Sequence, residues 1–167
     1  GDAVSPPGTV PERTLIDIGP STARYRAIYF RHTFQVADPA QFESLIIRSL
    51  HDDGSAVYLN GSLVATFNLT NAPGIPITYS NLAAANGGRD GTIYAVSNII
   101  SSLVPGLNCV AVEVHQDTTT SSDLSFDLML WGIPPAGPVL SITTAGATYS
   151  VSWNDPGLQF KLQQSSN

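Results

Sequence analysis

An Asn-Gly pair at positions 60 and 61 constrains the fold of this chain more than any other feature. The pair separates two apolar runs, residues 56–59 and 62–67. A two-residue turn between antiparallel strands needs positive φ at both central positions, and Asn followed by Gly accepts those angles most readily. The sequence therefore predicts a tight β-hairpin here, and with it an antiparallel sheet.

Three further segments alternate apolar and polar residues with the period of a half-buried strand, namely residues 27–36, 109–116 and 124–131. Turn residues separate the segments, and no run shows a helical period. This pattern predicts an all-β protein, an antiparallel β-sandwich of the jelly-roll kind over residues 25–132. The expected core includes Val110, Val112, Val114, Phe126 and Leu128.

The two ends of the chain differ from this central region. Residues 1–24 are rich in Pro and Gly and are expected to be irregular, and the Pro-rich residues 133–138 are expected to form a stiff linker. Residues 139–167 hold three short strands, at 140–144, 148–153 and 159–163, which are too few to bury a core. They are expected to form either a partial immunoglobulin-like β unit or a β-stranded tail that docks. A tail strand from the same chain or a neighbouring copy is a candidate to fill a vacant sheet edge by β-strand addition.

Composition excludes several kinds of partner. The net charge is -6 and the seven Lys and Arg residues are scattered, so the chain lacks the basic stripe that nucleic acids or anionic membranes require. No apolar run approaches the ~20 residues needed to cross a bilayer. The single cysteine, Cys109, is expected in the core. Sparse lysine and Ser/Thr/Asn-rich turns favour a secreted or cell-surface protein.

Four segments carry a family resemblance: YFRHTF at residues 29–34, DDGSAVYLNG at 52–61, GLNCVAVEVHQ at 106–116 and SDLSFDL at 122–128. Over about residues 13–132 the chain resembles the galactose-binding-like jelly-roll modules attached to large secreted bacterial proteins, and the sugar-binding jelly-roll domain of some β-glycosidases. The resemblance implies a secreted, bacterial, carbohydrate-binding accessory module, with which a structural calcium is compatible. Because this fold hosts many functions, the resemblance indicates the fold more than the ligand.

Two groups of residues are candidates for binding a polysaccharide or glycan. Tyr79 and Tyr94 flank the long connection 70–91, which also carries Arg89 and Asp90, and such aromatic and polar side chains suit a sugar ring. The alternative is that both tyrosines only cover the rim of the sandwich.

The second group is Glu113 with His115. These residues lie two apart on one predicted strand and therefore share the face opposite the core valines. The alternative for this pair is a cross-strand network that stabilises the sheet, for example with Arg31.

Acidic residues suggest a calcium site. Asp52 and Asp53 precede Gly54, and Asp123 and Asp127 join them if the last strand lies close, because calcium takes oxygen ligands from loops. The alternative is a turn stabilised by Asp side chains bonding to their own backbone.

The motifs of common hydrolases are not found in the sequence: it contains neither Gly-x-Ser-x-Gly nor His-Glu-x-x-His. We therefore expect a non-catalytic module. The competing expectation is a structural or assembly module, such as a filament or adhesin subunit.

Overall fold

The computed structural model describes residues 14–69, 75–84, 93–97, 100–137 and 140–153. The chain divides into two compact units, Gly1–Pro134 and Pro135–Asn167. The boundary between the units falls inside the Pro-rich segment 133–138.

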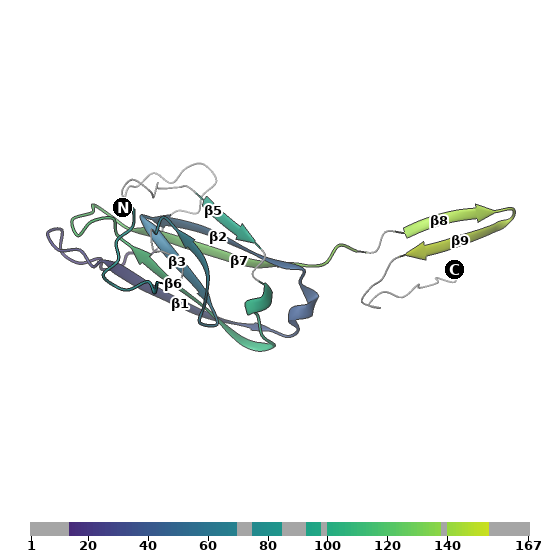
Figure 1. Ribbon diagram of the computed structural model, residues 1–167, viewed down its shortest axis with the longest axis horizontal. Helices are drawn as coiled ribbons and strands as arrows, with labels where there is room; N and C mark the ends of the chain where they lie inside the picture. The colour runs from purple at the N-terminus through teal and green to yellow at the C-terminus, as the bar shows by residue number, and fades with distance from the viewer. Residues whose placement is uncertain (1–13, 70–74, 85–92, 98–99, 138–139, 154–167) are drawn as a thin grey trace. The chain divides into compact units, whose positions relative to one another are not determined.

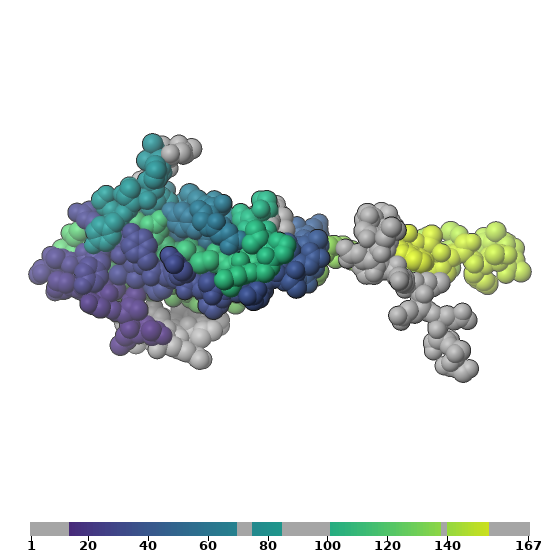
Figure 2. Space-filling model, turned by 90° about the horizontal axis from the view of Figure 1, so that it is seen from below, coloured from purple at the N-terminus to yellow at the C-terminus, as the bar shows by residue number. Residues whose placement is uncertain are grey.

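The first unit is built from two antiparallel sheets, drawn as ribbons in Figure 1 and as a space-filling view in Figure 2. Sheet A has the strand order β1 (Ala27–Val36), β6 (Gly106–His115), β3 (Gly54–Leu59), β4 (Ser62–Phe67). Sheet B has the order β5 (Ile93–Ser97), β2 (Ser44–Asp52), β7 (Ser125–Ile133). Two single-turn 3₁₀ helices, η1 (Pro39–Gln41) and η2 (Ile100–Ser102), lie in the connections. The predicted antiparallel β-sandwich is confirmed.

The Asn-Gly turn joins β3 to β4, as the sequence predicts. Asn60 and Gly61 have φ angles of 51° and 83°, so both central residues are left-handed. The Asn60 side chain also anchors the turn, because its Oδ1 accepts from the Cys109 N–H at 2.9 Å and its Nδ2 donates to Asn108 Oδ1 at 2.7 Å. The hairpin is thereby tied to the start of β6.

The core lies between the sheets and is centred on β6. Val110, Val112 and Val114 are buried, and Phe126 and Leu128 of β7 pack against this cluster, which confirms the predicted core. The rings of Phe30 and Phe126 stack across the two sheets with centroids 4.4 Å apart. The prediction for Cys109 was wrong: it is only half-buried, because alternation along β6 turns it to the face opposite Val110.

One end of the sandwich interior is polar. Along the buried face of β2 the side chains change from Leu45 and Ile47 to Ser49 and His51, both 0% exposed. Ser49 Oγ lies 3.1 Å from His51 Nδ1, and the His51 ring lies 5.1 Å from that of Phe67. Burial lowers the pKa of His51 to about 4.

The described part of the second unit is a hairpin of β8 (Leu140–Ala145) and β9 (Thr148–Trp153). Its register pairs Leu140 with Trp153 and Ile142 with Val151, so these apolar residues share one face. The third strand expected for this unit, residues 159–163, lies outside the described residues.

His51 makes stability depend on pH. Unfolded chains take up a proton on histidine near pH 6.5, whereas folded His51 stays neutral down to about pH 4, so stability is lost as pH falls between these values. The loss amounts to about 3 kcal/mol at most. Urea unfolding at pH 7 and pH 4.5 should therefore show a smaller loss for His51→Gln than for the wild type.

Two controls isolate this effect. His32 is exposed, so His32→Gln should keep the wild-type pH dependence. Burial raises the pKa of Asp53, so the contribution of Asp53 to stability increases as pH falls, opposite to that of His51. The quantity to compare is therefore the loss of stability between pH 7 and pH 4.5 in the wild type minus the loss in His51→Gln. Equal pH dependence of these two proteins would contradict the assignment.

Candidate functional site

The outer face of sheet A, on the side away from the core, carries a groove of about 470 Å³. Side chains of three neighbouring strands line it: Tyr29 and Arg31 from β1, Ala111 and Glu113 from β6, and Tyr58 from β3. The register places Tyr29 opposite Glu113, and both Arg31 and Tyr58 opposite Ala111. We call this surface the outer groove.

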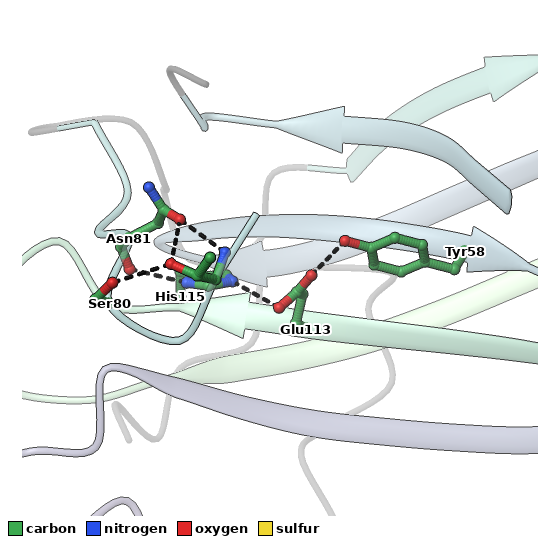
Figure 3. A network of polar contacts seen from close by, with 6 residues as sticks. Tyr58, Ser80, Asn81, Glu113 and His115 are labelled. Atoms are coloured by element: carbon green, nitrogen blue, oxygen red, sulfur yellow. Dashed lines mark hydrogen bonds and ion pairs between the residues drawn. The ribbon is translucent and has the colours of Figure 1, made fainter. Parts of the chain in front are cut away.

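Glu113 is the one acidic residue among the described residues that line the outer groove, and its carboxylate lies between Tyr58 and His115 (Figure 3). Its side chain is buried, and a buried carboxylate needs hydrogen-bonding partners. The Tyr58 hydroxyl donates to Oε1, and His115 Nε2 lies 3.3 Å from Oε2. The cross-strand network that the sequence suggested therefore exists, but its partner is Tyr58, while Arg31 lies opposite Ala111.

His115 connects this network to a turn. Its Nδ1 lies 2.9 Å from the Asn81 carbonyl oxygen, which only accepts, so Nδ1 carries a hydrogen. A proton on Nε2 as well would turn the contact with Glu113 into an ion pair. The turn is held by the Thr78 N–H donating to Asn81 Oδ1 at 2.7 Å and the Asn81 N–H donating to the Thr78 carbonyl at 3.0 Å. This turn carries Tyr79.

Tyr29 and Tyr58 lie beside Glu113 in the outer groove, and Tyr79 lies near Tyr29. Tyr29 and Tyr79 are 59% and 48% exposed, and the Tyr79 hydroxyl accepts from the Arg26 N–H at 3.3 Å. The pKa of Tyr29 is raised by partial burial, then by the charge of Glu113 and by Tyr79. The pKa of Tyr58 is raised by burial, by its hydrogen bond to Glu113 and by Tyr29. The outer groove is thus aromatic and acidic at its centre.

The structure brings some of the predicted sugar-binding residues together and separates others. Tyr79, Glu113 and His115 meet through the Asn81 turn. Glu113 lines the groove, whereas His115 is fully buried and reaches it only through Glu113. Arg89 and Asp90 lie outside the described residues. Tyr94 belongs to β5 in sheet B, where it pairs with Ser49, and only its backbone is described.

Sequence reasoning missed Tyr29 and Tyr58. The alternation in residues 27–36 was the available signal, since it turns Tyr29 and Arg31 away from the core. What the sequence did not give is that β1 and β3 flank β6 on either side.

Three of the four acidic residues proposed for calcium accept hydrogen bonds from different backbone or side-chain donors. Asp53 Oδ2 accepts from the Asp117 N–H at 2.7 Å, Asp123 Oδ1 from the Ser122 hydroxyl at 2.5 Å, and Asp127 Oδ1 from the Leu128 N–H at 2.9 Å. Asp52 is buried. Within the described ranges, no three His, Cys, Asp or Glu side chains gather as a metal site requires. The calcium site stays a prediction.

Comparison with known proteins adds fold-level likeness only. The chain matches no protein-family model and no curated protein sequence. It is similar to a solved β-D-mannosidase from Dictyoglomus thermophilum, with 19% identity over 55% of this chain and 9% of that chain and a TM-score of 0.35. It is also similar to an α-L-rhamnosidase from the same organism, with 10% identity over 80% of this chain and 13% of that chain and a TM-score of 0.46. This chain thus spans a small part of each enzyme.

Across the described ranges, no helix is long and apolar enough to span a bilayer.

Removing the Tyr58 hydroxyl should destabilise the protein. Tyr58→Phe leaves Glu113 Oε1 without its donor in a buried site, at a cost of about 1–3 kcal/mol. Tyr29→Phe is the matched control, because Tyr29 is exposed on the same face, and it should change stability by less than about 0.5 kcal/mol. Urea unfolding at pH 7 measures both. If Tyr58→Phe and the wild type were equally stable, the hydrogen bond from Tyr58 would not be what stabilises the buried Glu113 carboxylate.

Proposed function

We propose that this chain is a non-catalytic, extracellular accessory module that binds carbohydrate through the outer groove. The observation that carries the proposal is the pair Tyr29 and Tyr58 beside the Glu113 carboxylate in the outer groove, with exposed Tyr79 close enough to Tyr29 to raise its pKa. The resemblance to galactose-binding-like modules of secreted bacterial proteins points to the same ligand class.

The groove offers the two kinds of contact that a sugar ring needs. A pyranose has an apolar C–H face, which stacks on exposed aromatic rings such as those of Tyr29 and Tyr79. Its hydroxyl rim needs polar partners, and the exposed Arg31 guanidinium and the Tyr29 hydroxyl are available on the same face. One-sided stacking with polar contacts at the edge therefore suits a saccharide held on the sheet surface.

The groove is also organised before any ligand arrives. Arg26 holds the Tyr79 hydroxyl, and the Asn81 turn that carries Tyr79 is bonded to buried His115. Tyr58 is fixed by Glu113. Ordering these side chains in the free protein lowers the entropic cost of binding.

The polar chemistry of the groove favours binding over hydrolysis. Most glycosidases place two carboxyl groups on either side of the bond that breaks. Among the described residues that line the outer groove, Glu113 is the one carboxylate, and its two oxygens face Tyr58 and His115. The pair required for acid–base cleavage is therefore missing from the described lining.

The test is retention on polysaccharides. The wild type is screened on a glycan array and by affinity electrophoresis in gels that contain plant or bacterial polysaccharides. For a ligand so found, Tyr29→Ala and Tyr79→Ala should each weaken binding by about tenfold, since each removes one stacking ring. Tyr25 is similarly exposed but belongs neither to the lining of the outer groove nor to the turn that carries Tyr79, so Tyr25→Ala should bind like the wild type.

Two results would contradict the proposal. One is retention that Tyr29→Ala and Tyr79→Ala leave unchanged, and the other is failure of every polysaccharide to retain the wild type. Melting temperatures of the variants separate a lost contact from a lost fold. Release of reducing sugar from the retained polysaccharide would contradict the non-catalytic assignment.

A second candidate function is a structural or assembly module joined by β-strand addition. The observation that favours it is the apolar face of the β8–β9 hairpin, where Leu140 and Ile142 are 62% and 68% exposed.

A further inference from the structure

The sandwich also has an apolar cleft between its two sheets, which shares Phe30, Arg31 and Val112 with the lining of the outer groove but not Tyr29, Tyr58 or Glu113. Its volume is about 620 Å³, and it lies where β1 and β7, the edge strands of sheets A and B, face each other. Phe30, Phe34 and Val36 form one wall, and Phe126, Leu128 and Leu130 form the other. Except for Val36, these side chains are only partly buried, so this part of the core is incompletely covered.

Each wall of the cleft also has a free backbone edge. Among the described strands, β1 pairs with β6 alone and β7 with β2 alone. Unpaired N–H and C=O groups along such edges are a template for another strand. The rim is polar, with Arg31 and Gln35 on β1 and Asp127 on β7.

The β8–β9 hairpin exposes an apolar face. One of its faces presents Leu140, Ile142, Tyr149, Val151 and Trp153, and the other presents Ser141, Thr143, Thr148, Ser150 and Ser152. Ile142 and Tyr149 are 68% and 73% exposed. An isolated two-stranded hairpin is at best marginally stable in water, and none of the other described residues of the second unit covers this apolar face.

We propose that the β8–β9 hairpin of one copy covers the inter-sheet cleft of a second copy. The dimensions agree: the cleft walls span residues 30–36 and 126–132, about 23 Å of strand, and the hairpin strands are six residues long, about 20 Å. The hairpin is also uncharged, because residues 140–153 contain no Asp, Glu, Lys or Arg. Covering the apolar cleft therefore does not bury any charge of the hairpin itself.

The linker favours a neighbouring copy over the same chain. Pro134, Pro135 and Pro138 restrict the backbone between β7 and β8, and Pro-rich segments act as semi-rigid spacers rather than as tight reversals. Because the cleft and the hairpin are different surfaces, the contact is heterologous. Repeating it builds an open chain of copies unless the rotation happens to close a ring. This inference does not depend on carbohydrate binding.

Analytical ultracentrifugation of the full chain over a concentration series tests the contact. The wild-type mass should rise above 17.6 kDa with concentration. Ile142→Asp and Val151→Asp put a charge on the apolar face and should weaken association roughly tenfold or more. Ser141→Asp and Ser150→Asp put the same charge on the opposite face and should associate as the wild type does.

Cysteine pairing identifies the two surfaces and the chains that supply them. In a Cys109→Ser background, a Gln35→Cys chain mixed with a Thr144→Cys chain should form a mixed disulfide dimer, because one residue lies on the cleft rim and the other on the apolar hairpin face.

Three outcomes would overturn the proposal. The first is a mass of 17.6 kDa at every concentration. The second is equal weakening by Ser141→Asp and Ile142→Asp. The third is a chain carrying both cysteines that closes on itself as a monomer, since the hairpin would then cover its own cleft.

Discussion

Strand β6 is paired on both edges, and the rest of the sandwich depends on how its buried polar side chains find hydrogen-bonding partners. Its inward valines form the centre of the core. At its start, buried Asn108 bonds to Asn60 and to the backbone of Val104, which fixes the β3–β4 hairpin. At its end, Glu113 and His115 bond to Tyr58 and the Asn81 turn. Because buried polar groups need partners, these bonds determine which loops can lie beside the strand.

The same bonds shape the outer groove, so a stabilising role of Glu113 and His115 is compatible with the proposed binding role of the groove. The carboxylate of Glu113 is too deeply buried to be left without donors. Tyr58 donates to it directly, while His115 lies beside its other oxygen and is hydrogen-bonded to the turn that carries Tyr79. A network whose first role is to compensate a buried charge therefore also holds an aromatic surface in one conformation, which is the condition for binding a weakly interacting ligand such as a sugar.

Local features of the sequence predicted much of the fold, whereas the site depended on pairings between distant segments. Asn60-Gly61 specified a hairpin because its φ angles are a local property, and alternation identified the buried faces of β6 and β7. Nothing local states that residue 29 lies beside residue 113, or residue 58 beside residue 111. Tyr94 was grouped with Tyr79 because the two flank one connection, yet β5 belongs to sheet B. Cys109 sits in an apolar run, where composition alone does not reveal which face is buried.

The two proposals reinforce each other through geometry. The inter-sheet cleft opens between β1 and β7, whereas the outer groove lies on the face of sheet A that points away from sheet B. Tyr29 and Tyr58 line the groove and not the cleft, so a hairpin of another copy seated in the cleft would leave both rings accessible, although Arg31 lines both surfaces. A chain of copies would then repeat the groove along its length. Individual tyrosine platforms bind sugars weakly, but linked sites on one polysaccharide act at a high effective concentration. An open head-to-tail assembly would thus convert a weak single-copy contact into firm attachment to a repetitive polymer, without any additional residue in the groove.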